Sequence, residues 1–182
     1  MPTPAPDEAR RIAMLLEDGW DAVHLRHPGV PCNYMMSVLK SLPHDMIEKI
    51  VIHDHFMLAA DFKVGALHLN SRHPAAPAWY TGAVTASCHS IEEVSGSHDR
   101  RYVTLSPVFD SISKPGYKSA FSLSQLRGLE ASPVKVIALG GINHDNIHKL
   151  SSLPFSGYAV MGAIAWHEDI NQFKTSFRCF SS

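Results

Sequence analysis

The sequence has few cysteines and no long apolar run. Its three cysteines, Cys32, Cys88 and Cys179, lie far apart and form no CxxC pair. This argues against a disulfide framework or a cysteine-rich zinc site and fits a reducing compartment. No apolar run approaches the roughly 20 residues that a membrane-spanning helix needs, and the first eleven residues, MPTPAPDEARR, lack the apolar segment of a signal peptide. We therefore expect a cytoplasmic protein that does not enter the membrane.

An excess of charge of either sign is also missing. Sixteen basic and seventeen acidic residues give a formal net charge of −1, so we expect no binding to nucleic acid or to an anionic membrane. A hydrophobic content of 45% and a charged content of 18% are typical of a globular protein. With no sign of a linker, repeat or low-complexity segment, the sequence predicts a single domain over residues 1–182.

Short apolar runs alternate with segments of helical pattern. The runs predict seven strands, at residues 22–26, 49–54, 66–70, 85–89, 102–107, 135–141 and 157–162. The intervening segments predict helices at residues 7–19, 33–42, 55–62, 90–96, 122–130 and 143–153, and loops at residues 29–32 and 71–84. Such alternation implies parallel strands joined by right-handed crossovers.

This order favours the α/β class and a TIM (β/α)₈ barrel that lacks its first strand at the N-terminus. Either the chain is truncated there, or the barrel is open at that edge. No GxGxxG motif follows the first predicted strand, which counts against a dinucleotide-binding fold.

Glycines follow the last two predicted strands. Gly140 and Gly141 end one of them, Gly162 ends the other, and Asn143 is placed to cap the next helix. TIM barrels bind phosphate in the loops after strands seven and eight. Glycine lets backbone N–H groups approach a phosphate closely, and a helix N-terminus adds positive charge. The alternative is two tight turns that simply need glycine.

Charged and imidazole side chains follow the earlier strands. His24 and Arg26 are two residues apart and should face the same side. An arginine inside a barrel needs an anionic partner. That partner is either a bound phosphate or diphosphate, which makes Arg26 a substrate residue, or Asp54 or Asp110 in a structural ion pair.

His89 follows a mid-barrel strand that also carries Ser87. A general acid or base is expected at that position, although a lone histidine is often just a satisfied core residue.

The sequence His53-Asp54-His55 resembles a metal-binding motif, and His68 or His73 could supply a further ligand. We expect His53 and His55 to share one face of the strand and Asp54 to point the other way. Zinc geometry is compatible with this pattern but is not specified by it.

The segment SPVFDSISKPGY, residues 106–117, ends an apolar strand with hydroxyls, a lysine and a Pro-Gly turn. Ser111, Ser113 and Lys114 together predict an anion-binding loop.

Six segments, in their order and spacing, resemble the thiamine-phosphate synthase family, which includes the thiazole tautomerase branch. The resemblance spans residues 7–166, and it is carried by DAVHLRHP, IVIHDHFMLAADFKVGALHLN, SCHSIEEV, YVTLSPVFDSISKPGY, VIALGGIN and GYAVMGAI. It implies a (β/α)₈ barrel with a strand ahead of the first helix. It also implies an enzyme that joins hydroxymethylpyrimidine diphosphate to thiazole phosphate with Mg²⁺ and releases pyrophosphate.

The resemblance assigns roles to residues of this chain. The diphosphate would be held by Arg26, Ser111, Ser113 and Lys114. The thiazole phosphate would be held by Gly140, Gly141 and Gly162. His89 would be the acid/base of the tautomerase branch and Asp54 a metal ligand, and the strand ends add the substrate-binding candidates Ser87, His24 and His53.

Three positions depart from the family pattern. Pro28 replaces a lysine, His53 replaces the asparagine of an Asn-Asp pair, and His73 replaces the second metal-binding aspartate. Mg²⁺ prefers oxygen ligands, so the expected ion would depend on Asp54 and the oxygens of the diphosphate.

We therefore predict a thiamine-phosphate synthase with catalytic Lys114, Arg26 and His89. The alternatives are a tautomerase-type isomerase that uses His89, a barrel that binds a phosphorylated ligand without catalysis, and a histidine-based metal hydrolase. The predicted partners are small phosphorylated substrates, and a homodimer would be unsurprising.

Overall fold

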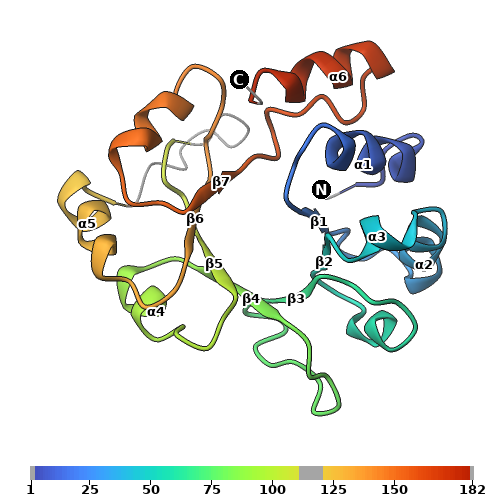
Figure 1. Cartoon of the computed structure of the whole chain (residues 1–182), viewed down its shortest axis with the longest axis horizontal. Helices are drawn as coiled ribbons and strands as arrows, with labels where there is room; N and C mark the ends of the chain where they lie inside the picture. Colours follow the sequence, from blue (N-terminus) through green and yellow to red (C-terminus); the bar gives the residue numbers. More distant parts are fainter. Residues whose placement is uncertain (1–2, 111–120, 181–182) are drawn as a thin grey trace. The chain divides into compact units, whose positions relative to one another are not determined.

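The computed structural model describes residues 3–110 and 121–180. They belong to two compact units, of which the first comprises Met1–Val84 with Ala165–Ser182 and the second comprises Thr85–Ile164 (Figure 1). The predicted anion-binding residues Ser111, Ser113 and Lys114 lie outside the described residues.

The first unit contains three short parallel strands in chain order. They are β1 (Val23–Leu25), β2 (Ile50–Ile52) and β3 (Ala66–Leu69). Its helices are α1 (Glu8–Glu17), α2 (Cys32–Lys40), α3 (His44–Ile47), the 3₁₀ helix η1 (Phe56–Ala60) and α6 (Ile170–Arg178). All three residues of β2 and all four of β3 are buried, as expected for parallel strands covered on both faces.

The two end segments of this unit are joined through α1 and α6. The carboxylate of Asp169 accepts hydrogen bonds from the backbone N–H groups of Asn171 and Gln172, which caps α6. Arg11 of α1 donates to the carbonyl oxygen of Glu168 over 2.7 Å, and its guanidinium lies 4.9 Å from the ring centre of Phe173. These contacts fix the C-terminal helix against the first helix.

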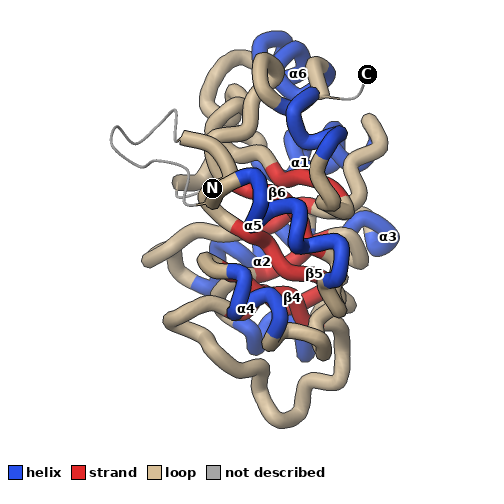
Figure 2. The backbone as a smooth tube through the Cα atoms, turned by 90° about the vertical axis from the view of Figure 1, so that its left-hand side faces the viewer, coloured by secondary structure: helices blue, strands red, loops and turns tan. Residues whose placement is uncertain are grey.

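The second unit contains four parallel strands, again in chain order. They are β4 (Val84–Cys88), β5 (Tyr102–Leu105), β6 (Val136–Leu139) and β7 (Gly157–Ala159). Its helices are α4 (Ile91–Ser95), α5 (Leu123–Arg127) and the 3₁₀ helices η2 (Gly128–Ala131) and η3 (Ile147–Ser152). Helices α4 and α5 lie on one face of the strands (Figures 1 and 2), where Val94 and Leu126 join Val103, Leu105 and Val136 in one core.

The predicted order of elements is confirmed. In the described residues a helix comes first, and seven strands follow it in chain order, with helices between successive strands except between β3 and β4, where the predicted loop lies. The prediction of a single domain over residues 1–182 stays a prediction. No helix in the described part of the chain is long and apolar enough to cross a membrane.

Several boundaries and helix types differ from the prediction. The segments 55–62 and 143–153 form the 3₁₀ helices η1 and η3. Cys32 begins α2 and Val84 begins β4, although both were predicted as loop residues. Helices α3 and α6 were not predicted.

A buried hydrogen-bond network connects α1, α2 and the segment after β1. The carboxylate of Glu8 accepts from Tyr34 Oη over 2.6 Å and lies 2.8 Å from His27 Nε2. Glu8 and His27 are 6% and 1% exposed, and burial, reinforced by the Glu8 carboxylate, raises the pKa of Tyr34. Since His27 directly follows Arg26, the network holds the backbone from which that arginine projects.

We predict that Glu8→Ala lowers the free energy of unfolding by about 2 kcal/mol or more, because each buried partner left without a hydrogen bond costs about 1–3 kcal/mol. Urea unfolding followed by circular dichroism measures the change. The control is Glu17→Ala, which removes an exposed carboxylate from the same helix. Equal unfolding midpoints for the two variants would contradict the structural role of the network.

Candidate functional site

Three histidines of the first unit share one face of its strands. His24 lies in β1, His53 directly follows β2, and His68 lies in β3. Strand β2 pairs with both neighbours, and the residues just before His53 and His68, Ile52 and Leu67, are register partners. Because side chains alternate between the two faces of a strand, the three imidazoles meet.

The three rings are in direct contact. His24 Nδ1 and His53 Nε2 are 2.8 Å apart and share a hydrogen bond. The rings of His53 and His68 are stacked with centroids 4.1 Å apart, and the centroids of His24 and His68 are 5.1 Å apart. One nitrogen from each ring lies within 4.8 Å of the other two.

Burial keeps this cluster neutral. His53 is 8% exposed and His68 only 1%. Desolvation lowers the pKa of His24 to about 4 and that of His68 to about 3. It also lowers the pKa of His53, and the neighbouring histidines and Arg26 lower it further. Neutral imidazole keeps a lone pair on one ring nitrogen, so each ring can accept a hydrogen bond or bind a metal ion.

Arg26 directly follows β1, and Asp54 lies two residues after the end of β2. The two side chains do not form an ion pair with each other. The ion pairs of Asp54 run from its Oδ1 to Arg72 Nη2 over 3.3 Å and to His73 Nε2 over 3.0 Å. Arg26 instead lies near the cluster, where its charge lowers the pKa of His53 and of His68. The alternative in which Asp54 neutralises Arg26 is therefore not what the structure contains, and an anionic ligand for Arg26 stays a prediction.

The described side chains near Asp54 do not fit a Mg²⁺ ion on their own. Within residues 3–110 and 121–180 the buried Asp54 Oδ2 has no hydrogen-bond partner, but Oδ1 faces two nitrogen groups, Arg72 and His73. Mg²⁺ takes oxygen ligands and is poorly served by imidazole or guanidinium. We assign the ion no part in the reaction, and Mg²⁺ at Asp54 stays a prediction.

His55 does not belong to the cluster, contrary to the expectation that it shares a face with His53. The strand ends at Ile52, and His55 has a left-handed backbone with φ of 54°. Its Nε2 donates to the carbonyl oxygen of Val30 over 2.8 Å. The imidazole beside His53 is that of His24, and not that of His55.

In the second unit, His89 follows β4 and is exposed. Its Nδ1 lies 3.1 Å from the carbonyl oxygen of Ser106. A carbonyl only accepts hydrogen bonds, so Nδ1 carries the proton and Nε2 of the neutral ring keeps its lone pair. This is the tautomer that a base acting through Nε2 requires. Ser87 lies in the same strand, two residues earlier.

The glycines after β6 have a packing role. Gly140 and Gly141 have φ of 95° and 67°. A Cβ on Gly141 would lie 2.3 Å from the carbonyl oxygen of Asp110, and one on Gly140 would lie 2.8 Å from Pro107 Cα. Gly162 is exposed in the turn after β7. The close contacts require glycine at positions 140 and 141, and the predicted phosphate-binding role of all three glycines stays a prediction.

Asn143 caps a turn rather than a helix. Its Oδ1 accepts from the backbone N–H groups of Asp145 and Asn146 over 2.9 and 3.1 Å. The helix η3 begins only at Ile147. The predicted capping chemistry is present, four residues before the helix.

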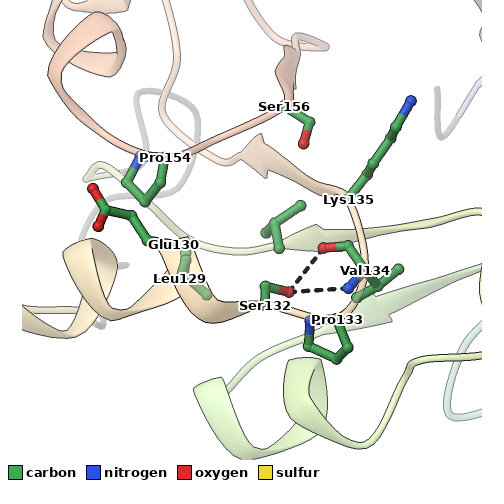
Figure 3. A pocket seen from close by; sticks show the side chains of 9 residues that line it. Leu129, Glu130, Ser132, Pro133, Val134, Lys135, Pro154 and Ser156 are labelled. Carbon is green, nitrogen blue, oxygen red and sulfur yellow. Dashed lines mark hydrogen bonds between the residues drawn. The ribbon is translucent and has the colours of Figure 1, made fainter.

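Figure 3 shows a surface depression in the second unit. It is lined by segments that precede β6 and β7, including Ser132, Val134, Lys135 and Ser156. Ser132 Oγ donates to the carbonyl oxygen of Val134 over 2.8 Å. Because TIM-barrel chemistry takes place at the carboxyl ends of strands, this depression at the amino ends is not the candidate site.

Residues 3–164 match the family model described as thiamine monophosphate synthase. The chain belongs to this family. It is 30% identical to a thiamine-phosphate synthase of Latilactobacillus sakei over 67% of this chain and 58% of that protein. It is 27% identical to one of Salinibacter ruber over 94% of this chain and 79% of that protein.

A crystal structure of a thiamine phosphate pyrophosphorylase from Bacteroides thetaiotaomicron has the same fold. The TM-score is 0.85 at 33% sequence identity, with 98% of this chain and 91% of that chain covered. Membership of the thiamine monophosphate synthase family was thus predictable from the motifs. The mutual contact of His24, His53 and His68 was not, although their alternation along neighbouring strands is visible in the sequence.

We predict that Gly141→Ala destabilises the chain by about 2 kcal/mol or more, because the left-handed backbone and the overlap with residues 109–110 both oppose a methyl group. Gly128→Ala is the control, since no atom lies within 4 Å of a Cβ at that position. Thermal unfolding of both variants tests this, and an unchanged melting temperature for Gly141→Ala would contradict the close approach.

Proposed function

We propose that this chain is a thiamine-phosphate synthase, a transferase that couples hydroxymethylpyrimidine diphosphate to thiazole phosphate. The observation that carries the proposal is the family match over residues 3–164. The Bacteroides thetaiotaomicron pyrophosphorylase, aligned over 98% of this chain, supports it.

The reaction breaks the bond between the pyrimidine methylene carbon and the diphosphate oxygen. The bonding electron pair leaves with the diphosphate, and the ring nitrogen of the thiazole phosphate then bonds to the methylene carbon. Negative charge therefore grows on the departing oxygen. Preorganised cations and hydrogen-bond donors at that oxygen lower the barrier.

We assign this stabilisation to Arg26, Lys114, Ser111 and Ser113. The support for Arg26 is its place after β1, where the described ion pairs of Asp54 leave it unneutralised by that carboxylate. The two serines and Lys114 are assigned by the resemblance of the segment SPVFDSISK alone.

The remaining substrate contacts are assigned to strand ends of the two units. In the first unit, the neutral rings of His24 and His53 offer donors and acceptors to a polar ring such as an aminopyrimidine. In the second unit, Ser87 and the backbone N–H groups of Gly140, Gly141 and Gly162 are assigned to substrate binding, the glycines to the thiazole phosphate.

The test is formation of thiamine phosphate from the two substrates by the purified chain. We expect product with the wild-type chain and a loss of about 100-fold or more in kcat for Lys114→Ala and for Arg26→Gln, as is typical when one group that stabilises developing charge is removed. Lys135→Ala is the matched control, because this exposed lysine lies at the amino end of β6.

Two results would overturn the proposal. Folded wild-type chain that forms no thiamine phosphate is not a synthase, and the isomerase reaction at His89 then becomes the one to assay. Product formation that Lys114→Ala and Arg26→Gln leave unchanged would refute the residue assignment.

A further inference from the structure

We propose that His24, His53 and His68 form a binding site for a zinc ion. The inference stands on the first unit alone and does not rest on the proposed synthase activity. His24 lies in β1, His53 directly follows β2, and His68 lies in β3, so each strand of that unit contributes one imidazole. Among the described residues these three form the group of potential metal ligands whose donor atoms lie within 4.8 Å of one another.

The separation of His24 and His53 suits a metal ion, whereas the stacked rings of His53 and His68, with centroids 4.1 Å apart, have to tilt apart before both can bind it. Tetrahedral zinc with Zn–N bonds of about 2.0–2.1 Å places ligand nitrogens about 3.3 Å apart. His24 Nδ1 and His53 Nε2 are 2.8 Å apart. A shift of about half an ångström would therefore exchange the hydrogen bond for two bonds to one ion, and small rotations of the rings supply it.

The chemical state of the rings also suits a metal ion. Zinc binds the neutral imidazole, and a histidine that is protonated must first lose its proton. Desolvation keeps His24 and His68 neutral well below pH 7. No ring has to lose a positive charge at neutral pH, but the proton shared by His24 Nδ1 and His53 Nε2 has to move to the other nitrogen of its ring before both atoms can bind the ion.

The ligand set selects the class of ion. Three imidazoles suit zinc, cobalt, nickel and copper, whereas Mg²⁺ and Ca²⁺ take oxygen ligands. Three protein ligands leave one position of a tetrahedral zinc open, as in catalytic zinc sites. The positive charge of Arg26 nearby favours an anion at that position, such as hydroxide or a phosphate oxygen.

The experiment measures binding of Co²⁺, and displacement by Zn²⁺, to the full chain without substrates. The visible absorption of bound Co²⁺ reports imidazole coordination, and calorimetry gives the stoichiometry and affinity of Zn²⁺. We expect one ion per chain. In His24→Gln, His53→Gln and His68→Gln the affinity should fall by more than the 10–100-fold that loss of an outer-shell partner costs.

Control variants separate this site from other histidines. His98→Gln and His148→Gln change exposed histidines of the second unit, and His73→Gln changes the histidine paired with Asp54. All three should keep wild-type affinity. Binding that survives His53→Gln, or that is lost in His73→Gln, would place the ion elsewhere and overturn the proposal, as would the absence of stoichiometric binding to the wild type.

A second measurement covers variants that fail to fold. Crystals of the wild-type chain grown with Zn²⁺ are measured at the zinc absorption edge. An anomalous peak between the three rings supports the site. Peaks confined to surface histidines refute it, whether or not the chain proves to be a synthase in the activity assay.

Discussion

The parallel pairing of short, buried strands is the constraint on which the candidate site depends. In the first unit the pairing aligns β1, β2 and β3 in register, and alternation then decides which side chains meet. Leu25, Ile52 and Leu67 are buried on one face, while the histidines between them are gathered on the other. A shift of one residue in the pairing of any strand would move its apolar side chains to the face of the histidines and its histidine to the apolar face. The apolar contacts that stabilise the strands therefore also position the imidazoles.

Outside the strands, hydrogen bonds to charged groups fix the segments that carry the functional side chains. Glu8 holds His27, the residue after Arg26, and Asp54 is held by Arg72 and His73. In the second unit the carbonyl oxygen of Ser106 sets the tautomer of His89. In each case a short connecting segment, which has little apolar surface of its own, is held by one or two polar contacts.

The sequence predicted the secondary structure well where apolar runs mark a strand. It predicted poorly those features that depend on a single contact between distant residues. The seven strands were predictable because each lies in a short apolar run bounded by turn residues. Helix α3 has only four residues, His44–Ile47, and so shows no periodicity, while η3 is shortened because Asn143 and Asn146 hold a turn ahead of it. His24 and His53 were predicted as site residues, but their contact with His68 follows from the register, which no local pattern contains. The pairing of Asp54 with His73 likewise depends on the path of the chain after β3.

The face that carries the imidazoles is better explained by a ligand than by packing. Val51 and Ala66 occupy the same face of β2 and β3 and are fully buried without any polar group, so the fold itself accepts aliphatic side chains there. Both proposed ligands, a polar substrate ring and a zinc ion, use the neutral imidazole that burial enforces. A substrate ring and a zinc ion compete for the lone pairs of His24 and His53, whereas an ion held by three nitrogens keeps a position open to a phosphate oxygen, an anion that the nearby charge of Arg26 also attracts.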